Sequence, residues 1–100
     1  MAAVTQPLAG DEVITKVGYD AFVGTELEAR LVALGVRHLI VAGVFSELCV
    51  DAIARTGFQK GYRVSVVSDA TMPLERAADE VLGFMQRYYD VAIVTAATAT

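Results

Sequence analysis

A single cysteine stands where a strand is expected to pass into a helix. Leu39–Ala42 is an apolar run typical of a buried parallel strand, and residues 51–59 have the composition and spacing of a helix. Cys49 therefore falls in the first turn of that helix, with Ser46 as the expected N-cap. Free amides and the positive end of the helix dipole favour a thiolate there and also bind an oxyanion. The arrangement predicts a cysteine nucleophile.

The elements that must position this cysteine alternate between strands and helices. Strands are expected at residues 12–16, 37–42, 62–67 and 91–94, and helices between Thr25 and Gly35, after Ser46, and at Leu74–Tyr88. The order β-α-β-α-β-α-β requires a parallel sheet with helices on both faces. The predicted fold class is therefore α/β, a three-layer α/β/α domain with a mostly parallel, doubly wound, Rossmann-like sheet. Residues 1–10 are expected to form a flexible leader and residues 11–100 the domain.

The first helix carries its own boundary signals. Thr25 and Glu28 have the spacing of a capping box, and Gly35 follows the helix as a C-cap. Leu27, Leu31 and Leu34 recur at spacings of four and three, which predicts a buried face. Residues 68–73 are expected to form a turn, and residues 95–100 to fray.

The composition of the chain bears on its core, its cellular compartment and the class of ligand that it binds. The 100 residues are 55% hydrophobic with a mean hydropathy of +0.49, which suits strands covered on both faces or a surface buried against a partner. No apolar run approaches the ~20 residues that cross a bilayer. One cysteine excludes an internal disulfide and favours a reducing compartment, so we expect a cytoplasmic protein. The net charge of −4 is interspersed, which favours small molecules or protein over nucleic acid and membrane.

Several short motifs follow one another along nearly the whole chain. They are Ile14–Lys16, Tyr19–Phe22, Gly24–Leu27, Leu34–Val36, Leu39–Val44, Cys49–Val50, Gly61–Val64 and Val67–Ala70. In this order the chain resembles the isochorismatase-like cysteine hydrolases, which include nicotinamidases, N-carbamoylsarcosine amidohydrolase and ureidoacrylate amidohydrolases. Members of this family hydrolyse small amides through a Cys–Asp–Lys triad.

The resemblance implies roles for individual residues. It places the nucleophile on Cys49 and the triad lysine on Lys16, and it implies a cis peptide bond between Val44 and Phe45 beside the oxyanion site. Attack on a carboxamide would give a thioester at Cys49, which water then cleaves. A cysteine nucleophile indicates C–N rather than vinyl-ether hydrolysis.

The resemblance also bears on substrate and cofactor. It suggests an aromatic substrate slot formed by Tyr19 and Phe22, although both rings could equally pack onto the core. No cofactor is expected. The family's metal ligands, where present, come from a portion without a counterpart here. His38, the single histidine, is expected to have a strand-end role.

One part of the family pattern has no counterpart. The family's catalytic aspartate lies near the start of the chain, on a strand that we do not find, so the sequence resembles the C-terminal portion of a member. We therefore expect an impaired hydrolase. Four carboxylates could stand in for the aspartate, each with a simpler structural role: Asp20, Glu47, Asp51 and Asp69.

A second hypothesis is a catalytically silent truncated homologue that serves as an assembly or interaction subunit. The family's strand order would leave Leu39–Ala42 at an apolar sheet edge with unpaired backbone groups. A partner chain, a rearranged strand or a homodimer should then cover that edge. A weaker third hypothesis is a receiver-type binding module, which Asp11 and Glu12 resemble superficially.

Overall fold

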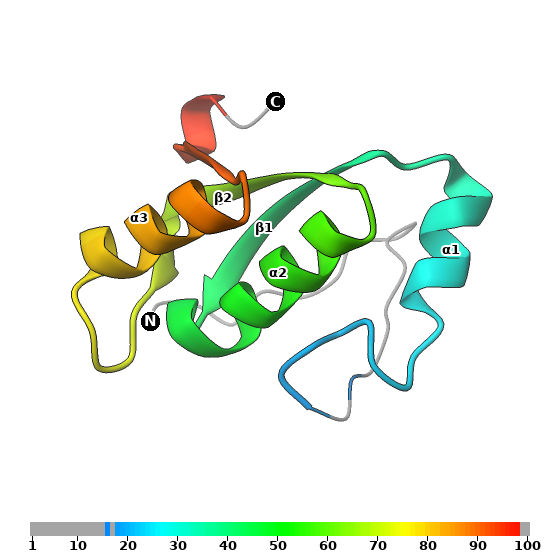
Figure 1. Cartoon of the computed structure of the whole chain (residues 1–100), viewed down its shortest axis with the longest axis horizontal. Coiled ribbons are helices and arrows are strands. Elements are labelled where there is room, and N and C mark those ends of the chain that lie inside the picture. Colours follow the sequence, from blue (N-terminus) through cyan, green and yellow to red (C-terminus); the bar gives the residue numbers. More distant parts are fainter. Residues whose placement is uncertain (1–15, 17, 99–100) are drawn as a thin grey trace.

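The structure is a computed structural model that describes residues 16 and 18–98 (Figure 1). Its elements are helix α1 (Leu27–Leu34), strand β1 (His38–Val44), the π-helical turn η1 (Ser46–Val50), helix α2 (Asp51–Gln59), strand β2 (Arg63–Met72), helix α3 (Ala78–Tyr88), strand β3 (Ala92–Val94) and the 3₁₀ turn η2 (Ala96–Thr98). Residues 1–15, which hold the expected leader and most of the first expected strand, lie outside the described residues. Lys16 has no regular secondary structure.

The three strands form a parallel sheet in the order β1-β2-β3. This confirms the α/β class with a parallel sheet. Helices α2 and α3 lie side by side on one face of the sheet (Figure 1). Within the described part of the chain, β1 is an edge strand because it pairs with β2 alone. Among residues 16 and 18–98, no strand pairs with the other side of the strand that leads to the cysteine.

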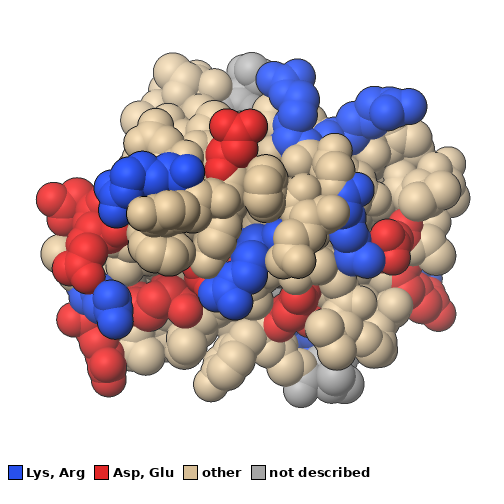
Figure 2. All heavy atoms as spheres, viewed as in Figure 1, with Lys and Arg blue, Asp and Glu red and all other residues tan. Residues whose placement is uncertain are grey.

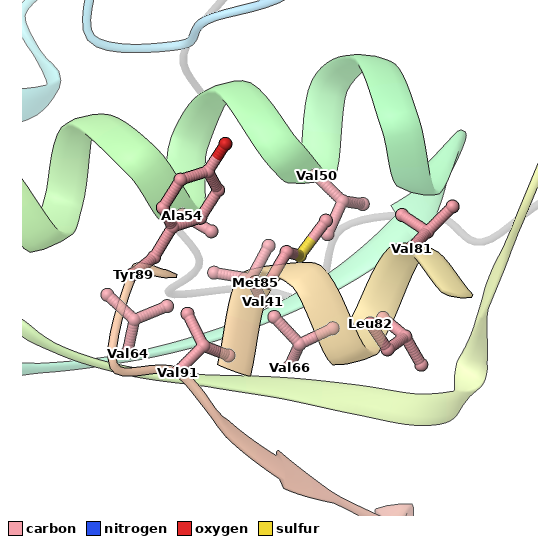
Figure 3. Packing of buried hydrophobic residues seen from close by; sticks show 10 residues of the cluster. All are labelled: Val41, Val50, Ala54, Val64, Val66, Val81, Leu82, Met85, Tyr89 and Val91. Atoms are coloured by element: carbon pink, nitrogen blue, oxygen red, sulfur yellow. The ribbon is translucent and has the colours of Figure 1, made fainter. Parts of the chain in front are cut away.

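The core fills the space between the sheet and the two helices (Figure 3). Met85 from α3 and Ala54 from α2 are fully buried, and Val66 of β2 lies beneath them with no exposed surface. The approach of α2 to the sheet is close at Gly57, where an added Cβ would lie 3.0 Å from Leu39 Cδ1 and 3.2 Å from Val64 Cγ2. Helix α2 is therefore held firmly over the two strands.

Helix α1 differs from the sequence prediction in its packing. None of its residues is buried, and Leu34 is 64% exposed, so the prediction of a buried leucine face is wrong for the described structure. The reason is that no other described helix or strand lies against that face. The predicted C-cap is confirmed, but the predicted N-cap is wrong, because Glu26 and not Thr25 occupies the N-cap position. Thr25 Oγ1 accepts the Leu27 N–H (3.2 Å) and Gly35 adopts a left-handed conformation (φ 71°), whereas Glu28 pairs with Lys60 instead of closing a capping box.

Strand β2 extends through residues that the sequence predicts as a turn. It pairs with β1 up to Val41↔Val66 and again at Gly43↔Thr71, so the register shifts between the two stretches. Residues 68–72 are thus part of the strand, and the turn prediction is wrong there. Helix α3 correspondingly starts at Ala78 rather than Leu74.

Candidate active site

Cys49 lies in η1, directly after β1, with a half-buried and free thiol. The peptide bond between Val44 and Phe45 is cis, as the family resemblance implies. The Leu48 and Val50 amides both donate to the Phe45 carbonyl oxygen (3.1 and 3.3 Å), which gives the turn its wide, π-helical geometry. The cysteine therefore stands at the strand–turn–helix junction that the sequence predicts.

Ser46 does not cap this helix. Phe45 occupies the N-cap position, and the Ser46 side chain is 1% exposed. Its hydroxyl has no hydrogen-bond partner among residues 16 and 18–98. Ser46 shares its helical face with Val50 and Ala54, which pack into the core, so its side chain points inward and away from the free amides. The N-cap prediction is wrong for this reason.

Lys16 makes a hydrogen bond within its own loop. Its side chain is exposed, and its Nζ donates to the Tyr19 carbonyl oxygen at 3.4 Å. Among the described residues, no hydrogen bond or ion pair joins the Lys16 ammonium to the thiol. Asp20, which binds Thr56 of α2, follows Lys16 by four positions in the chain.

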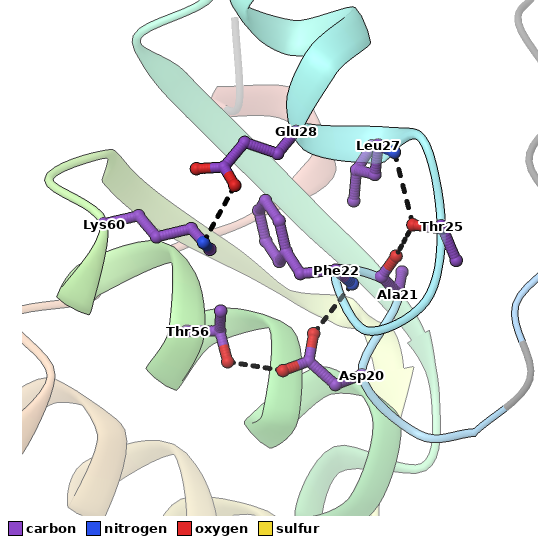
Figure 4. A network of polar contacts seen from close by, with 8 residues as sticks. All are labelled: Asp20, Ala21, Phe22, Thr25, Leu27, Glu28, Thr56 and Lys60. Carbon is purple, nitrogen blue, oxygen red and sulfur yellow. Dashed lines mark hydrogen bonds and ion pairs between the residues drawn. The ribbon is translucent and has the colours of Figure 1, made fainter.

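Asp20 is held by two hydrogen bonds (Figure 4). Its Oδ1 accepts the Phe22 N–H at 2.9 Å, and its Oδ2 accepts the hydroxyl of Thr56 on α2. Thr56 lies seven residues after Cys49, or about 10 Å along the helix axis. The Asp20 carboxylate therefore ties the loop before α1 to the cysteine helix instead of turning toward the thiol.

Glu47 binds the loop that precedes α3. Its carboxylate accepts the N–H groups of Leu74 (2.6 Å), Glu75 (2.9 Å) and Arg76 (2.9 Å). These three hydrogen bonds lower the pKa of Glu47 from 4.5 to about 2. They also fix the loop of residues 74–76, which precedes α3.

The last two candidate carboxylates also have structural partners. Asp51 forms an ion pair with Arg55, whose Nε donates to the Tyr89 hydroxyl at 3.0 Å. The Tyr89 hydrogen bond and the Asp51 charge together raise the pKa of the Arg55 guanidinium. Asp69 accepts the Ala96 N–H at 2.8 Å and so holds η2 against the end of the sheet.

The pocket between α2 and α3 is separate from the thiol. It has a volume of about 330 Å³, and its lining includes Glu47 and Asp51 but not Cys49.

Figure 2 shows acidic and basic side chains interspersed over this face of the molecule. The expectation that the chain binds no nucleic acid stays a prediction.

The two aromatic candidates and His38 differ in their surroundings, and the predicted substrate slot stays a prediction. Tyr19 is 60% exposed, whereas Phe22 is half-buried and stacks obliquely on Tyr62 with ring centroids 6.2 Å apart. His38 Nε2 lies 2.8 Å from Ser65 Oγ, which fits a strand-end role. In the part of the chain that the structure describes, no three His, Cys, Asp or Glu side chains gather to hold a metal ion, and no helix is long and apolar enough to cross a membrane.

Comparison with known proteins decides the family. The isochorismatase domain matches residues 2–99. The chain belongs to the isochorismatase family. It is 44% identical over 66 residues to ureidoacrylate amidohydrolase RutB from Yersinia enterocolitica, and 44% identical over 61 residues to nicotinamidase 3 from Arabidopsis thaliana. The structure of N-carbamoylsarcosine amidase from Thermoplasma acidophilum matches with a TM-score of 0.85 and 29% identity.

These isochorismatase-family relatives are much longer than this chain. The matches cover 66% and 61% of the chain but 29% and 31% of the two relatives, and 90% of the chain but 51% of the amidase structure. Residues 16 and 18–98 therefore correspond to about half of an isochorismatase fold. That half includes the strand β1, the turn η1 and Cys49.

Two residues that the sequence analysis did not single out contribute to this site. Thr56 binds Asp20, and Lys60 pairs with Glu28 at 3.0 Å. A signal for both was present, because positions seven and eleven residues after Cys49 return to the same face of an ideal helix.

Proposed function

We propose that this isochorismatase-family chain carries the nucleophile of a hydrolase that cleaves the C–N bond of a small amide. The observation that supports this best is the position of Cys49 on η1, one turn after a cis peptide bond at the end of a parallel strand. The names of its relatives, ureidoacrylate amidohydrolase and nicotinamidase, point to the same bond type. A lone cysteine also suits the reducing cytoplasm, where we place the protein.

The chemistry follows from the thiol. The Cys49 sulfur attacks the carboxamide carbon, a C–S bond forms, and the carbonyl electron pair moves to oxygen, where amides of the turn stabilise it. Collapse of this intermediate breaks the C–N bond and releases ammonia or an amine, which takes up a proton. Water then cleaves the thioester and restores the thiol. Lys16 would favour the thiolate by its charge.

The proton transfers need a carboxylate that the described residues do not offer beside the thiol. Asp20, Glu47, Asp51 and Asp69 each bind other groups. We therefore propose that the acid–base group comes from outside residues 16 and 18–98, and that these residues alone turn over amides poorly.

The test is the rate of Cys49 alkylation by iodoacetamide as a function of pH, followed by mass spectrometry. We expect rapid labelling near neutral pH that slows when Lys16→Ala removes the charge. Arg63→Ala removes a cation from the exposed start of β2 and serves as the matched control. Labelling confined to alkaline pH, at the same rate in Lys16→Ala, would show that the lysine and thiol do not cooperate.

A second candidate function is that of an interaction subunit, and the exposed apolar residues of β1 favour it. Ile40 is 49% and Val44 40% exposed on this edge strand, and Val32 and Leu34 of α1 are 68% and 64% exposed. We propose that this surface binds a polypeptide that supplies the rest of the isochorismatase fold, because the matched amidase has about as much chain again beyond the match. Such a partner could also supply the missing carboxylate.

Sedimentation of the chain with a polypeptide made of the unmatched part of the Yersinia amidohydrolase tests this binding. We expect a heterodimer that Ile40→Lys disrupts and that Tyr88→Lys, at a 62% exposed position on α3, leaves intact. A homodimer, or a monomer that ignores the added polypeptide, would contradict the proposal.

A further inference from the structure

We propose that Asp20 and Thr56 are positioning residues for the Lys16–Cys49 pair. Their hydrogen bond holds the docking segment, residues 18–28, on the face of α2 that leads to Cys49. The inference rests on the proposed function, because it assigns the contact a role in bringing Lys16 to the thiol.

The docking segment is attached to α2 at two points (Figure 4). Asp20 accepts the Thr56 hydroxyl, and its other oxygen accepts the Phe22 N–H, so both carboxylate oxygens are fixed. At the C-cap of α2, four residues after Thr56, Lys60 pairs with Glu28 at 3.0 Å and its Nζ lies 5.7 Å from the centre of the Phe22 ring. Neither attachment is a contact between neighbours in sequence, so together they define where the segment lies.

Both attachments stand on the side of the helix that carries the thiol. At about 100° per residue, Thr56 and Lys60 lie within about 20° of the direction of Cys49 around the helix axis. Glu47, Asp51 and Arg55 line the pocket on the α3 side instead. The docking segment therefore runs along the cysteine face of α2.

The Asp20 attachment limits how far Lys16 can move from this face. Four residues span at most about 13 Å, and Thr56 is about 10 Å from Cys49 along the helix, so a chain extended from Asp20 toward the thiol is long enough to bring Lys16 to it. Without this attachment the nearest one is the half-buried Phe22 ring, which contacts Tyr62 and Lys60 and lies six residues from Lys16 instead of four. The local concentration of a flexible tethered group falls as the −3/2 power of tether length, which gives a loss of about twofold.

The experiment is a double-mutant cycle on the rate of Cys49 alkylation at neutral pH. It combines Lys16→Ala with Thr56→Val, which removes the hydroxyl and keeps the shape of the side chain. We expect the Lys16-dependent part of the rate to fall about twofold in Thr56→Val and to be retained in Thr56→Ser. Thr95→Val is the matched control, since the Thr95 hydroxyl contacts Thr98 and not the docking segment.

The outcomes separate this inference from the proposed function. No effect of Lys16→Ala in the otherwise unaltered chain would overturn the Lys16–Cys49 pairing itself. A Lys16 effect of the same size with and without the Thr56 hydroxyl would overturn the positioning role while leaving the pairing intact. If Thr56→Val fails to fold, Asp20→Ala removes the same hydrogen bond from the loop side and the cycle is repeated with that variant.

Discussion

Replacing Ser46 by alanine is expected to stabilise the protein, although Ser46 stands at the start of the cysteine helix. Its hydroxyl is buried with 1% of the residue exposed, and no described residue bonds to it. A buried hydroxyl without a partner costs about 1 kcal/mol or more, and alanine is a better helix former by roughly 0.5 kcal/mol. The substitution should therefore raise the free energy of unfolding by about 1 kcal/mol.

If Ser46 were an N-cap, its replacement by alanine would change the free energy of unfolding in the opposite direction. Losing a capping serine lowers the free energy of unfolding by about 1 kcal/mol. The two interpretations of Ser46 thus differ by roughly 2 kcal/mol, which is well outside the error of a urea titration read by circular dichroism. In melting temperature, the expected gain is about 4–8 °C.

Ser65→Ala is the matched control for this measurement. Ser65 is also buried, at 6% exposed, but its hydroxyl lies 2.8 Å from His38 Nε2. Removing that partner should lower the free energy of unfolding by about 1 kcal/mol. A loss of 1 kcal/mol or more in Ser46→Ala would refute the reasoning, because it would show that the Ser46 hydroxyl makes a stabilising bond.

Three further predictions concern the elements around the site. Met85→Ala, at a fully buried position under α2, should lower the free energy of unfolding by about 3 kcal/mol, measured by urea denaturation. Gly57→Leu should destabilise the folded protein strongly, because even a Cβ at this position would lie 3.0 Å from Leu39. Gly83→Leu on α3 is the milder comparison, and equal urea midpoints for the two variants would contradict the close packing at Gly57. The pKa of Glu47 is lowered in the folded state, so the ionised carboxylate stabilises the folded protein above about pH 4.5, and this contribution is lost as the pH falls toward 2. In an acid titration, Glu47→Gln should therefore lose less of its free energy of unfolding across this window than the unaltered chain.

Local sequence patterns predicted the elements around the cysteine well. The apolar run before Gly43 became β1, Gly35 ended α1 in the left-handed conformation, and the β-branched run near Val64 became the central strand β2. These features depend on a few adjacent residues, whose backbone preferences and hydrophobic spacing act over one or two turns. The family resemblance added the cis peptide bond at Val44–Phe45, which the backbone of the structure contains.

Contacts between distant residues were not predictable in the same way. The leucine spacing of α1 indicates a face that should be buried, but burial requires another element to lie against it. The roles of Glu47 and Asp20 likewise depend on partners 27 to 29 and 36 residues away. No local pattern tells whether a carboxylate will bind such a partner or face a thiol.

The sequence by itself determined that one cysteine follows a parallel strand at the start of a helix, because both elements follow from short-range backbone and hydrophobic patterns. The tertiary structure decided which groups surround that cysteine. It turned Ser46 into the core, fixed Asp20 to Thr56, and bound Glu47 to the loop before α3. Among the described strands it left β1 at the edge of the sheet, since pairing and burial are properties of the packed chain and not of any single segment.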